Sequence, residues 1–244
     1  MNKPVILTIT FLLFSVVLVN AQTVIWSEDF EGDWVTDWHV DAGTWEVGTP
    51  TSGPLSAFNG DNCAATVLSG NYPANANTRL IRHNSFTVPA ADQNPRLRFW
   101  HWYNISSADQ ATVQIKVGAE DWQTISETYT NTGSGIWTRP TIDLNAFAGS
   151  TVQIAFYFTS DNNGYSVSSG WYVDDVAVIT GPLVFNNPET WEEGLGDWYG
   201  DMGTWEVGTP ASGPGEAYMG ENCAATVLDG NYHANVNSRL ISPP

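Results

Sequence analysis

The sequence contains few cysteines and few basic residues, and both shortages limit the kinds of protein that it can encode. Two cysteines in 244 residues exclude a small scaffold held together by several disulfides. Eight Lys and Arg residues stand against 26 Asp and Glu residues, which gives a net charge of −18. This sign argues against nucleic acid or an anionic membrane surface as the partner. The 42% hydrophobic content is enough to bury a real core, so the chain is not disordered.

No apolar run in the chain is long enough for a membrane-spanning helix, which needs roughly 20 residues. The longest run extends from Val5 to Val19, with Lys3 before it and the small or polar residues Asn20 and Ala21 after it. This order is typical of a secretory signal peptide, so residues 1–21 are predicted to be removed by cleavage near Ala21 or Gln22. We therefore expect a protein that is secreted or held at the cell surface, without membrane insertion after cleavage.

Catalytic motifs are also missing. The four histidines are scattered, and no HExxH pair supplies a zinc site. The sequence has no GxSxG turn around a nucleophile and no phosphate-binding loop. The spacing of the carboxylates Glu28, Asp29 and Glu31 is not that of the sandwich-fold glucanases that such a pair would have to resemble. These absences predict that the chain is not an enzyme.

A long internal repeat sets the domain organisation. Residues 37–81 align without a gap with residues 197–241, and about 32 of the 45 positions are identical. An offset of this length indicates a duplication of whole domains rather than a solenoid. We predict a complete module in residues 23–180 and the N-terminal part of a second, truncated copy in residues 184–244. Half a module leaves strand edges uncovered, so we expect a longer parent protein; alternatively, residues 184–244 dock on the first module or on a partner.

The module is predicted to consist of strands. Apolar residues occupy every second position in residues 113–117 and 152–158, and aromatic residues dominate residues 97–103. Segments rich in glycine, proline and asparagine separate these runs at short intervals. The pattern predicts an all-β, two-sheet antiparallel sandwich of jelly-roll type.

The two cysteines occupy equivalent positions in the repeat, Cys63 and Cys223, so each module owns one thiol. A disulfide within a module is therefore excluded. A bridge between modules would need two equivalent positions to approach within about 7 Å between Cα atoms. We expect buried free thiols.

Four segments together carry a resemblance to a known family: residues 29–31 (DFE), 97–103 (LRFWHWY), 137–144 (WTRPTIDL) and 169–178 (SGWYVDDVAV). They resemble the MAM-like jelly-roll modules of secreted bacterial proteins, including the choice-of-anchor type and the domains beside immune-inhibitor-A-like metallopeptidases. The resemblance implies a concanavalin-like or galactose-binding-like sandwich with a non-catalytic adhesion or binding role toward an extracellular protein or glycan. The alternatives are an accessory domain of a secreted hydrolase, namely a metallopeptidase, and a carbohydrate-binding module.

The resemblance also implies a structural calcium ion, with the first and last strands lying side by side. Candidate ligands are Glu31, Asp29, Asp174 and Asp175, because Ca²⁺ prefers carboxylate oxygens. Strand alternation predicts that Asp174 shares a face with Val176 and Val178 while Asp175 points to the other side. The alternative is that these carboxylates accept backbone N–H groups without any metal.

Tryptophans are abundant, and several could stack on sugar rings. Most are expected to pack in the core or between the sheets, with a minority exposed on a binding face. The candidates are Trp38, Trp45, Trp100, Trp102, Trp122, Trp137 and Trp171.

Overall fold

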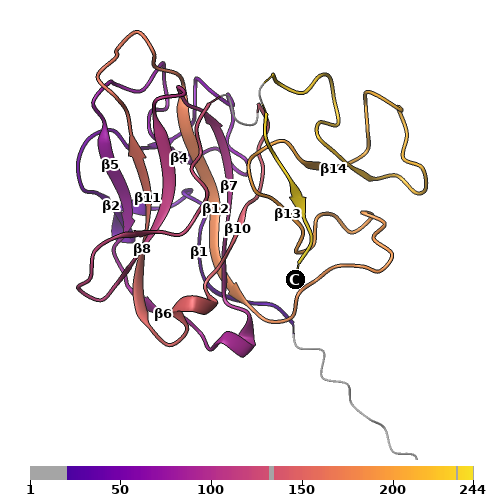
Figure 1. Cartoon of the computed structure of the whole chain (residues 1–244), viewed down its shortest axis with the longest axis horizontal. Coiled ribbons are helices and arrows are strands. Elements are labelled where there is room, and N and C mark those ends of the chain that lie inside the picture. The colour runs from indigo at the N-terminus through magenta and orange to yellow at the C-terminus, as the bar shows by residue number, and fades with distance from the viewer. Residues whose placement is uncertain (1–20, 132–134, 235, 244) are drawn as a thin grey trace, which may run out of the picture.

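The computed structural model describes residues 21–131, 135–234 and 236–243. The predicted signal peptide, apart from Ala21, lies outside these residues. Within them, residues 23–180 form two packed antiparallel sheets, which we call the sandwich (Figure 1). The remainder, residues 184–243, is called the C-terminal segment.

The first sheet, sheet I, is built around the long strand β12 (Gly170–Thr180). Its strand order is β10 (Thr141–Asp143), β7 (Arg96–Asn104), β12, β4 (Cys63–Ala65) and β3 (Glu46–Gly48). One edge of β12 pairs with β7. The other edge pairs first with β4 and then, from Val176 onward, with β1 (Thr23–Glu28). The first and last strands of the sandwich are therefore neighbours, as the family resemblance implied.

The second sheet, sheet II, is built around β11 (Thr151–Thr159). Its strand order is β2 (Trp38–Val40), β5 (Asn77–Arg82), β11, β8 (Gln110–Val117) and β9 (Gln123–Thr124), with β6 (Phe86–Thr87) beside β5 on the same edge of β11. The chain crosses repeatedly between the two sheets, and short 3-10 helices at Trp34–Thr36, Ala91–Gln93 and Asn145–Phe147 lie in the connections. The predicted antiparallel sandwich of jelly-roll type is confirmed.

The core lies between the sheets and is rich in aromatic rings. The predicted inward positions of β11, from Val152 to Phe158, are all buried. The inward ring of Phe156 packs edge to face against Trp171 of the opposite sheet, with 5.4 Å between ring centroids. Fully desolvated aromatic pairs of this kind contribute about 0.5–1.5 kcal/mol beyond the area that they bury. They tie the two sheets to each other.

A bulge in β12 changes the expected side-chain directions. Pairing with β7 shifts register between Asp174 and Ala177, and Asp175 has a positive φ of 45°. Trp171, Val173, Val176 and Val178 all belong to the core, so the inward phase moves by one residue at the bulge. The prediction that Asp174 shares a face with Val176 and Val178 is wrong, because an extra residue interrupts the alternation.

The C-terminal segment repeats the local pairing of the sandwich. Strand β14 (Glu206–Gly208) pairs with β15 (Cys223–Ala225), in the register that β3 has with β4. Strand β13 (Tyr199–Gly200) pairs with β16 (Leu240–Ile241), as β2 pairs with β5. Glu192 Oε1 accepts the backbone N–H groups of Glu221 and Asn222, as Glu31 Oε1 accepts those of Asp61 and Asn62.

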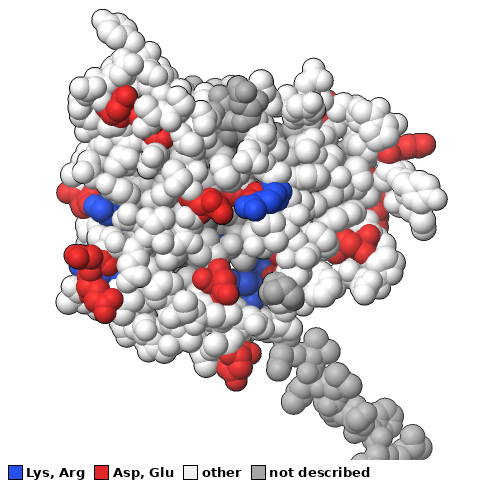
Figure 2. Space-filling model, in the orientation of Figure 1, with Lys and Arg blue, Asp and Glu red and all other residues white. Residues whose placement is uncertain are grey.

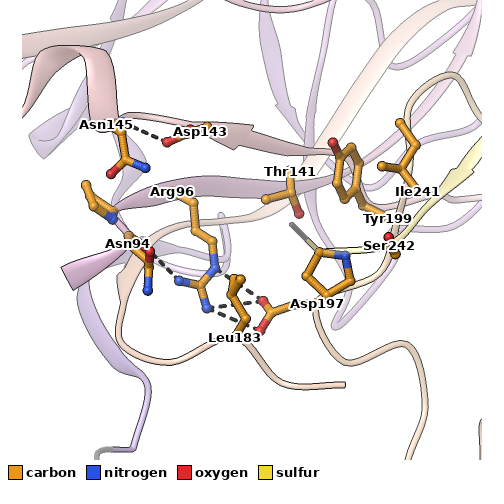
Figure 3. A pocket seen from close by; sticks show the side chains of 12 residues that line it. Asn94, Arg96, Thr141, Asp143, Asn145, Leu183, Asp197, Tyr199, Ile241 and Ser242 are labelled. Atoms are coloured by element: carbon orange, nitrogen blue, oxygen red, sulfur yellow. Dashed lines mark hydrogen bonds and ion pairs between the residues drawn. The ribbon is translucent and has the colours of Figure 1, made fainter. Parts of the chain in front are cut away.

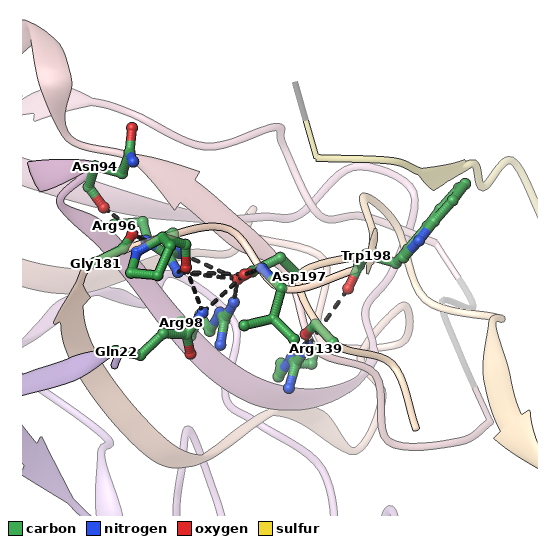
Figure 4. A network of polar contacts seen from close by, with 11 residues as sticks. Gln22, Asn94, Arg96, Arg98, Arg139, Gly181, Asp197 and Trp198 are labelled. Atoms are coloured by element: carbon green, nitrogen blue, oxygen red, sulfur yellow. Dashed lines mark hydrogen bonds and ion pairs between the residues drawn. The ribbon is translucent and has the colours of Figure 1, made fainter. Parts of the chain in front are cut away.

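The C-terminal segment contacts the sandwich through a buried carboxylate. Asp197 is 2% exposed, and it forms ion pairs with Arg96 at 3.1 Å and with Arg98. Gln22 Nε2 donates a further hydrogen bond to Asp197 Oδ2 at 2.7 Å. Arg139 reaches the same region and donates to the Trp198 carbonyl (Figure 4). Because an unpaired buried charge is costly, these contacts fix the segment against the outer face of sheet I.

The surface carries the acidity of the sequence. Figure 2 shows Asp and Glu side chains spread over the visible face, with a few Lys or Arg side chains between them. No helix among the described residues is long and apolar enough to cross a membrane.

Candidate functional site

The four predicted calcium ligands lie around one loop, residues 57–62. Asp29 and Glu31 follow the end of β1, and Asp174 and Asp175 form the bulge of β12. The pairing of β1 with β12 brings the two ends of the sandwich together, and residues 57–62 lie over both. We call these four carboxylates the acidic cluster.

Asp174 is the buried member of the acidic cluster. Its side chain is 0% exposed, and its Oδ2 accepts the backbone N–H groups of Phe58 at 2.9 Å and Asn59 at 3.2 Å. Its Oδ1 accepts the N–H of Asp175 at 2.7 Å. Burial raises the pKa of Asp174 to about 7, although the N–H donors oppose this shift.

The other three carboxylates are more exposed. Glu31 accepts the N–H groups of Asp61 and Asn62 at 2.8 and 2.7 Å, and the Asn62 side-chain amide at 3.2 Å. Asp29 accepts the N–H of Glu31. Burial, with a contribution from the negative charge of Asp29, raises the pKa of Asp175.

A cation would relieve the repulsion within the acidic cluster, but the same carboxylate oxygens also accept hydrogen bonds from N–H groups of the protein. Asp174 and Glu31 each accept three N–H donors, as described above. Among the described residues, no group of three or more His, Cys, Asp or Glu side chains is arranged to hold a metal ion. The structural calcium ion therefore stays a prediction.

A second constellation, which the sequence reasoning missed, lies on the outer face of sheet II. Arg79 of β5 donates through Nη1 to Asp41 Oδ2 at 3.1 Å and through Nε to Gln114 Oε1 at 2.9 Å. Its guanidinium group lies over the Tyr157 ring, 4.1 Å from the centroid. Trp122 lies at the same guanidinium, with 6.0 Å to its centroid. We call Asp41, Arg79, Gln114, Trp122 and Tyr157 the Arg79 face.

Strand alternation explains the Arg79 face. In β5 and β11 the inward residues Leu80 and Phe156 enter the core, so Arg79 and Tyr157, which are partners across the two strands, point outward together. The Asp41 carboxylate also accepts the Arg79 backbone N–H at 2.7 Å, which fixes the pair at the start of β5. A planar cation held on two sides over a ring is ordered without a ligand.

The repeat contains a signal that could have found this pair. Asp201 and Arg239 occupy the equivalent positions of the C-terminal segment. Asp201 accepts the Arg239 backbone N–H at 2.7 Å and also its Nε. Strand alternation does not require an acidic and a basic residue 38 positions apart. Their presence in both copies was therefore a signal in the sequence for a contact between them.

The tryptophans divide between core and surface. Trp38, Trp45, Trp102 and Trp171 are buried, as expected for most of the candidates. Trp100, Trp122 and Trp137 are half-buried. Trp100 stacks on Phe58 with 3.7 Å between ring centroids, which covers the outer face of sheet I rather than opening it.

Both cysteines are free thiols, as predicted, but they differ in burial. Cys63 is 0% exposed, and burial raises its pKa to about 12. Cys223 is only half-buried. The difference arises because β12 covers β4, whereas β15 pairs with β14 alone among the described strands.

A cavity of about 290 Å³ lies between the sandwich and the C-terminal segment (Figure 3). Asn94, Thr141 and Asn145 line it from the sandwich, and Leu183 and Tyr199 line it from the other side. The Arg96–Asp197 ion pair closes one end of the cavity.

Comparisons with known proteins give a partial relative in sequence and several similar structures. No protein-family model matches it, so the MAM-like resemblance stays a prediction. An alignment of 175 positions, which covers 68% of the chain, shows 31% identity to bacillopeptidase F of Bacillus subtilis (strain 168). The match spans 11% of the length of that relative.

Solved structures with a similar arrangement include two binding domains. The K2 cleaved adhesin domain of Lys-gingipain is 20% identical, with a TM-score of 0.44 over 65% of this chain and 97% of that one. The C-terminal family 22 carbohydrate-binding module of Clostridium thermocellum Xyn10B is 14% identical, with a TM-score of 0.43 over 66% of this chain and 97% of that one. The chain is thus similar in sequence to a small part of a much longer peptidase.

Proposed function

We propose that the chain is an extracellular, non-catalytic ligand-binding module and that a glycan binds on the Arg79 face. The observation that carries the proposal is the ordered Arg79 guanidinium over the Tyr157 ring. Two of its nitrogens are bonded to Asp41 and Gln114. Among the described residues no partner is found for the third nitrogen, Nη2, which leaves its N–H donors for a ligand.

A glycan matches this chemistry. Sugar rings present hydroxyl groups at their edges and apolar C–H groups on their faces. Arg79 supplies donors, the Asp41 and Gln114 oxygens supply acceptors, and the half-buried Trp122 ring supplies an apolar surface. Preorganised polar groups beside aromatic rings are the usual composition of small-ligand sites.

The histidines support a non-catalytic role. His101 is fully buried, its Nδ1 accepts the Trp171 indole N–H at 3.3 Å, and burial lowers its pKa to about 3. His39 stacks on His83 with 4.1 Å between ring centroids. In the part of the chain that the structure describes, no histidine side chain is hydrogen-bonded to a serine, threonine or cysteine side chain, the contact that a Ser–His or Cys–His nucleophile pair requires.

Binding to a glycan array tests the proposal, with two single-ring variants as a matched pair. Tyr157→Ala removes the ring beneath Arg79, and Trp100→Ala removes a half-buried ring from the opposite sheet. We expect the wild-type chain and Trp100→Ala to bind the same glycans and Tyr157→Ala to lose them. Absence of any glycan binding, or equal binding by both variants, would refute the proposal.

A second candidate role is that of an accessory module in a secreted peptidase, which the 31% identity to part of bacillopeptidase F favours. In this role the module binds and the peptide-cleaving site is elsewhere. The chain alone should then release no peptides from casein over hours of incubation, as measured by mass spectrometry. Cleavage that persists after repurification would contradict the accessory role.

A further inference from the structure

Two histidines from neighbouring strands meet on the outer face of sheet II. His39 lies in β2, where it pairs with Ile81 of β5, and His83 directly follows β5. Because Leu80 enters the core, its neighbour Ile81 and the partner His39 point outward. The two imidazole rings stack with 4.1 Å between their centroids and 25° between their planes. His39 is half-buried and His83 is exposed, so this His39–His83 pair is open to solvent.

The backbone around the His39–His83 pair is fixed by the sheet. Strand β2 pairs with β5 along its whole length, and the His83 N–H donates to the Asp37 carbonyl at 2.6 Å. The His83 carbonyl accepts the side-chain N–H of Gln153, which comes from β11, at 3.0 Å. The fold itself therefore brings the two rings together, and a ligand that binds both of them does not have to order the chain first.

The ring nitrogens of the pair are not used by the protein. Among the described residues, neither imidazole forms a hydrogen bond or an ion pair, and the His39 Nδ1 atom is buried without a partner. Burial and the neighbouring His83 lower the pKa of His39, although the Asp41 charge opposes this shift. The His39 ring is therefore neutral at pH 7, which is the form of imidazole that binds a metal ion.

The second copy of the repeat shows that the strands do not need these histidines. Strand β13 pairs with β16 as β2 pairs with β5. The residues equivalent to His39 and His83 are nevertheless Tyr199 and Pro243. Strand pairing therefore does not account for the two histidines, and their meeting in the sandwich points to a role outside it.

The spacing of the two rings suits a shared metal ion. Zn–N bonds are about 2.0–2.1 Å long, so two imidazole nitrogens on one tetrahedral ion lie about 3.3 Å apart. Rings that stack at 4.1 Å bring the nitrogens of one edge to this spacing through small rotations of the side chains. Imidazole nitrogen suits Zn²⁺, Cu²⁺ and Ni²⁺, whereas Ca²⁺ and Mg²⁺ take oxygen ligands.

We propose that the His39–His83 pair binds a divalent transition-metal ion of the zinc type through one nitrogen of each ring. The pair supplies two ligands, and water or an oxygen of a bound molecule takes the remaining positions. The ion links β2, the edge strand of sheet II, to the segment after β5. Both strands lie on the side of the sandwich away from the C-terminal segment (Figure 1). Neither ligand belongs to the acidic cluster or to the Arg79 face, so this site is separate from the glycan site.

Calorimetric titration of the full chain with zinc chloride at neutral pH tests the site. Excess calcium is present throughout, so that the carboxylates of the acidic cluster are not the ligands measured. His39→Tyr keeps an aromatic ring, as in the second copy, but removes the nitrogens, and His83→Gln removes the other imidazole. We expect one zinc ion per chain and at least about tenfold weaker binding in each variant. His233→Gln, which removes an exposed histidine of the C-terminal segment, should bind zinc as the wild-type chain does.

Nitrogen NMR of the imidazole rings in the wild-type chain identifies the ligands without a substitution. Zinc should shift the ring signals of His39 and His83 and leave those of His101 and His233 unchanged. Similar urea midpoints of the three variants would show that weaker binding is not due to unfolding. No zinc binding by the wild-type chain, equal affinity in His39→Tyr, or shifts confined to the other two histidines would overturn the proposal.

Discussion

Asp174 is the residue whose ionisation the fold changes in the most testable way. Its pKa rises from 3.8 to about 7 because burial disfavours the charged form. The folded state therefore binds a proton more tightly than the unfolded state does. Stability from this group is present at low pH and is lost as pH rises from about 4 to 7.

This shift predicts the pH dependence of unfolding. In chelator, the urea midpoint of the wild-type chain should fall between pH 5 and pH 7.5. Asparagine at position 174 cannot ionise, so the midpoint of the Asp174→Asn variant should fall less over the same interval. The difference between the two decreases separates Asp174 from the other carboxylates. A variant with the same decrease as the wild type would show that Asp174 does not titrate in this window.

At the same scale, the sequence identified some site residues and missed others. The carboxylates of the acidic cluster stood out because Asp and Glu near strand ends are simple to find. Arg79 did not, because a single arginine in a strand is typical of an ordinary outward position. Its role depends on Asp41, Gln114 and Tyr157, which come from three other segments, and no local pattern brings these together.

Two adjacent residues of β11, Phe156 and Tyr157, are expected to differ in how much they contribute to stability. Phe156 is 0% exposed and packs against Phe99 of sheet I and Trp38 of sheet II, whereas Tyr157 points outward. Phe156→Ala should lower the free energy of unfolding by about 3–5 kcal/mol. Tyr157→Ala should cost about 1 kcal/mol or less, as expected for a surface position.

Urea titrations of both variants measure this difference. Similar losses in the two would show that the outward face of β11 is part of a second buried core, and the assignment of the Arg79 face to the surface would be wrong.

The pairing of β1 with β12 is the element-level basis of the calcium prediction. A cation bound to the folded state alone raises the unfolding midpoint by mass action. We therefore expect a higher melting temperature with calcium than with excess chelator, and a reduced effect in Glu31→Gln. Superimposable melting curves would show that the N–H donors of residues 58–62 satisfy these carboxylates without a metal.

Elements were easier to predict than their irregularities. Period-two alternation located β8 and β11 because each keeps one face in the core along its length. The same rule failed in β12, where Asp174 and Asp175 form a bulge. A bulge depends on the positive φ of Asp175 and on the register of the neighbouring β7, and neither is encoded in the alternation.

At the scale of the molecule, Asp197 holds the C-terminal segment against the sandwich. Asp197→Ala would leave Arg96 and Arg98 buried without their carboxylate partner. We expect a loss of about 3–5 kcal/mol in the stability of this contact. Hydrogen exchange should become faster in residues 184–200.

The repeat supplies the control for this prediction. Asp37 is the equivalent residue of the sandwich, and its side chain accepts a hydrogen bond from Asn84 at the surface. Asp37→Ala should cost about 1 kcal/mol or less, without faster exchange in residues 184–200. Equal exchange in the two variants would show that Asp197 does not fix the segment.

The order of strands in the two sheets could not be predicted from the sequence. Neighbours such as β4 and β12, or β5 and β11, are far apart along the chain, and alternation assigns a face without assigning a partner. Strands β14 and β15 pair in the register of β3 and β4, since nearly identical sequences form the same local hairpin.

Calorimetric titration of an array-selected glycan into Arg79→Lys tests the central claim most directly. Lysine keeps the charge but loses the planar contact with Tyr157 and the Nε bond to Gln114. The control is Arg82→Lys on the same strand, β5. The guanidinium of Arg82 lies 4.3 Å from the ring centroid of Trp26 on β1, away from Tyr157. We predict at least about tenfold weaker binding for Arg79→Lys and unchanged binding for Arg82→Lys. Equal affinity of Arg79→Lys and the wild-type chain would contradict the account.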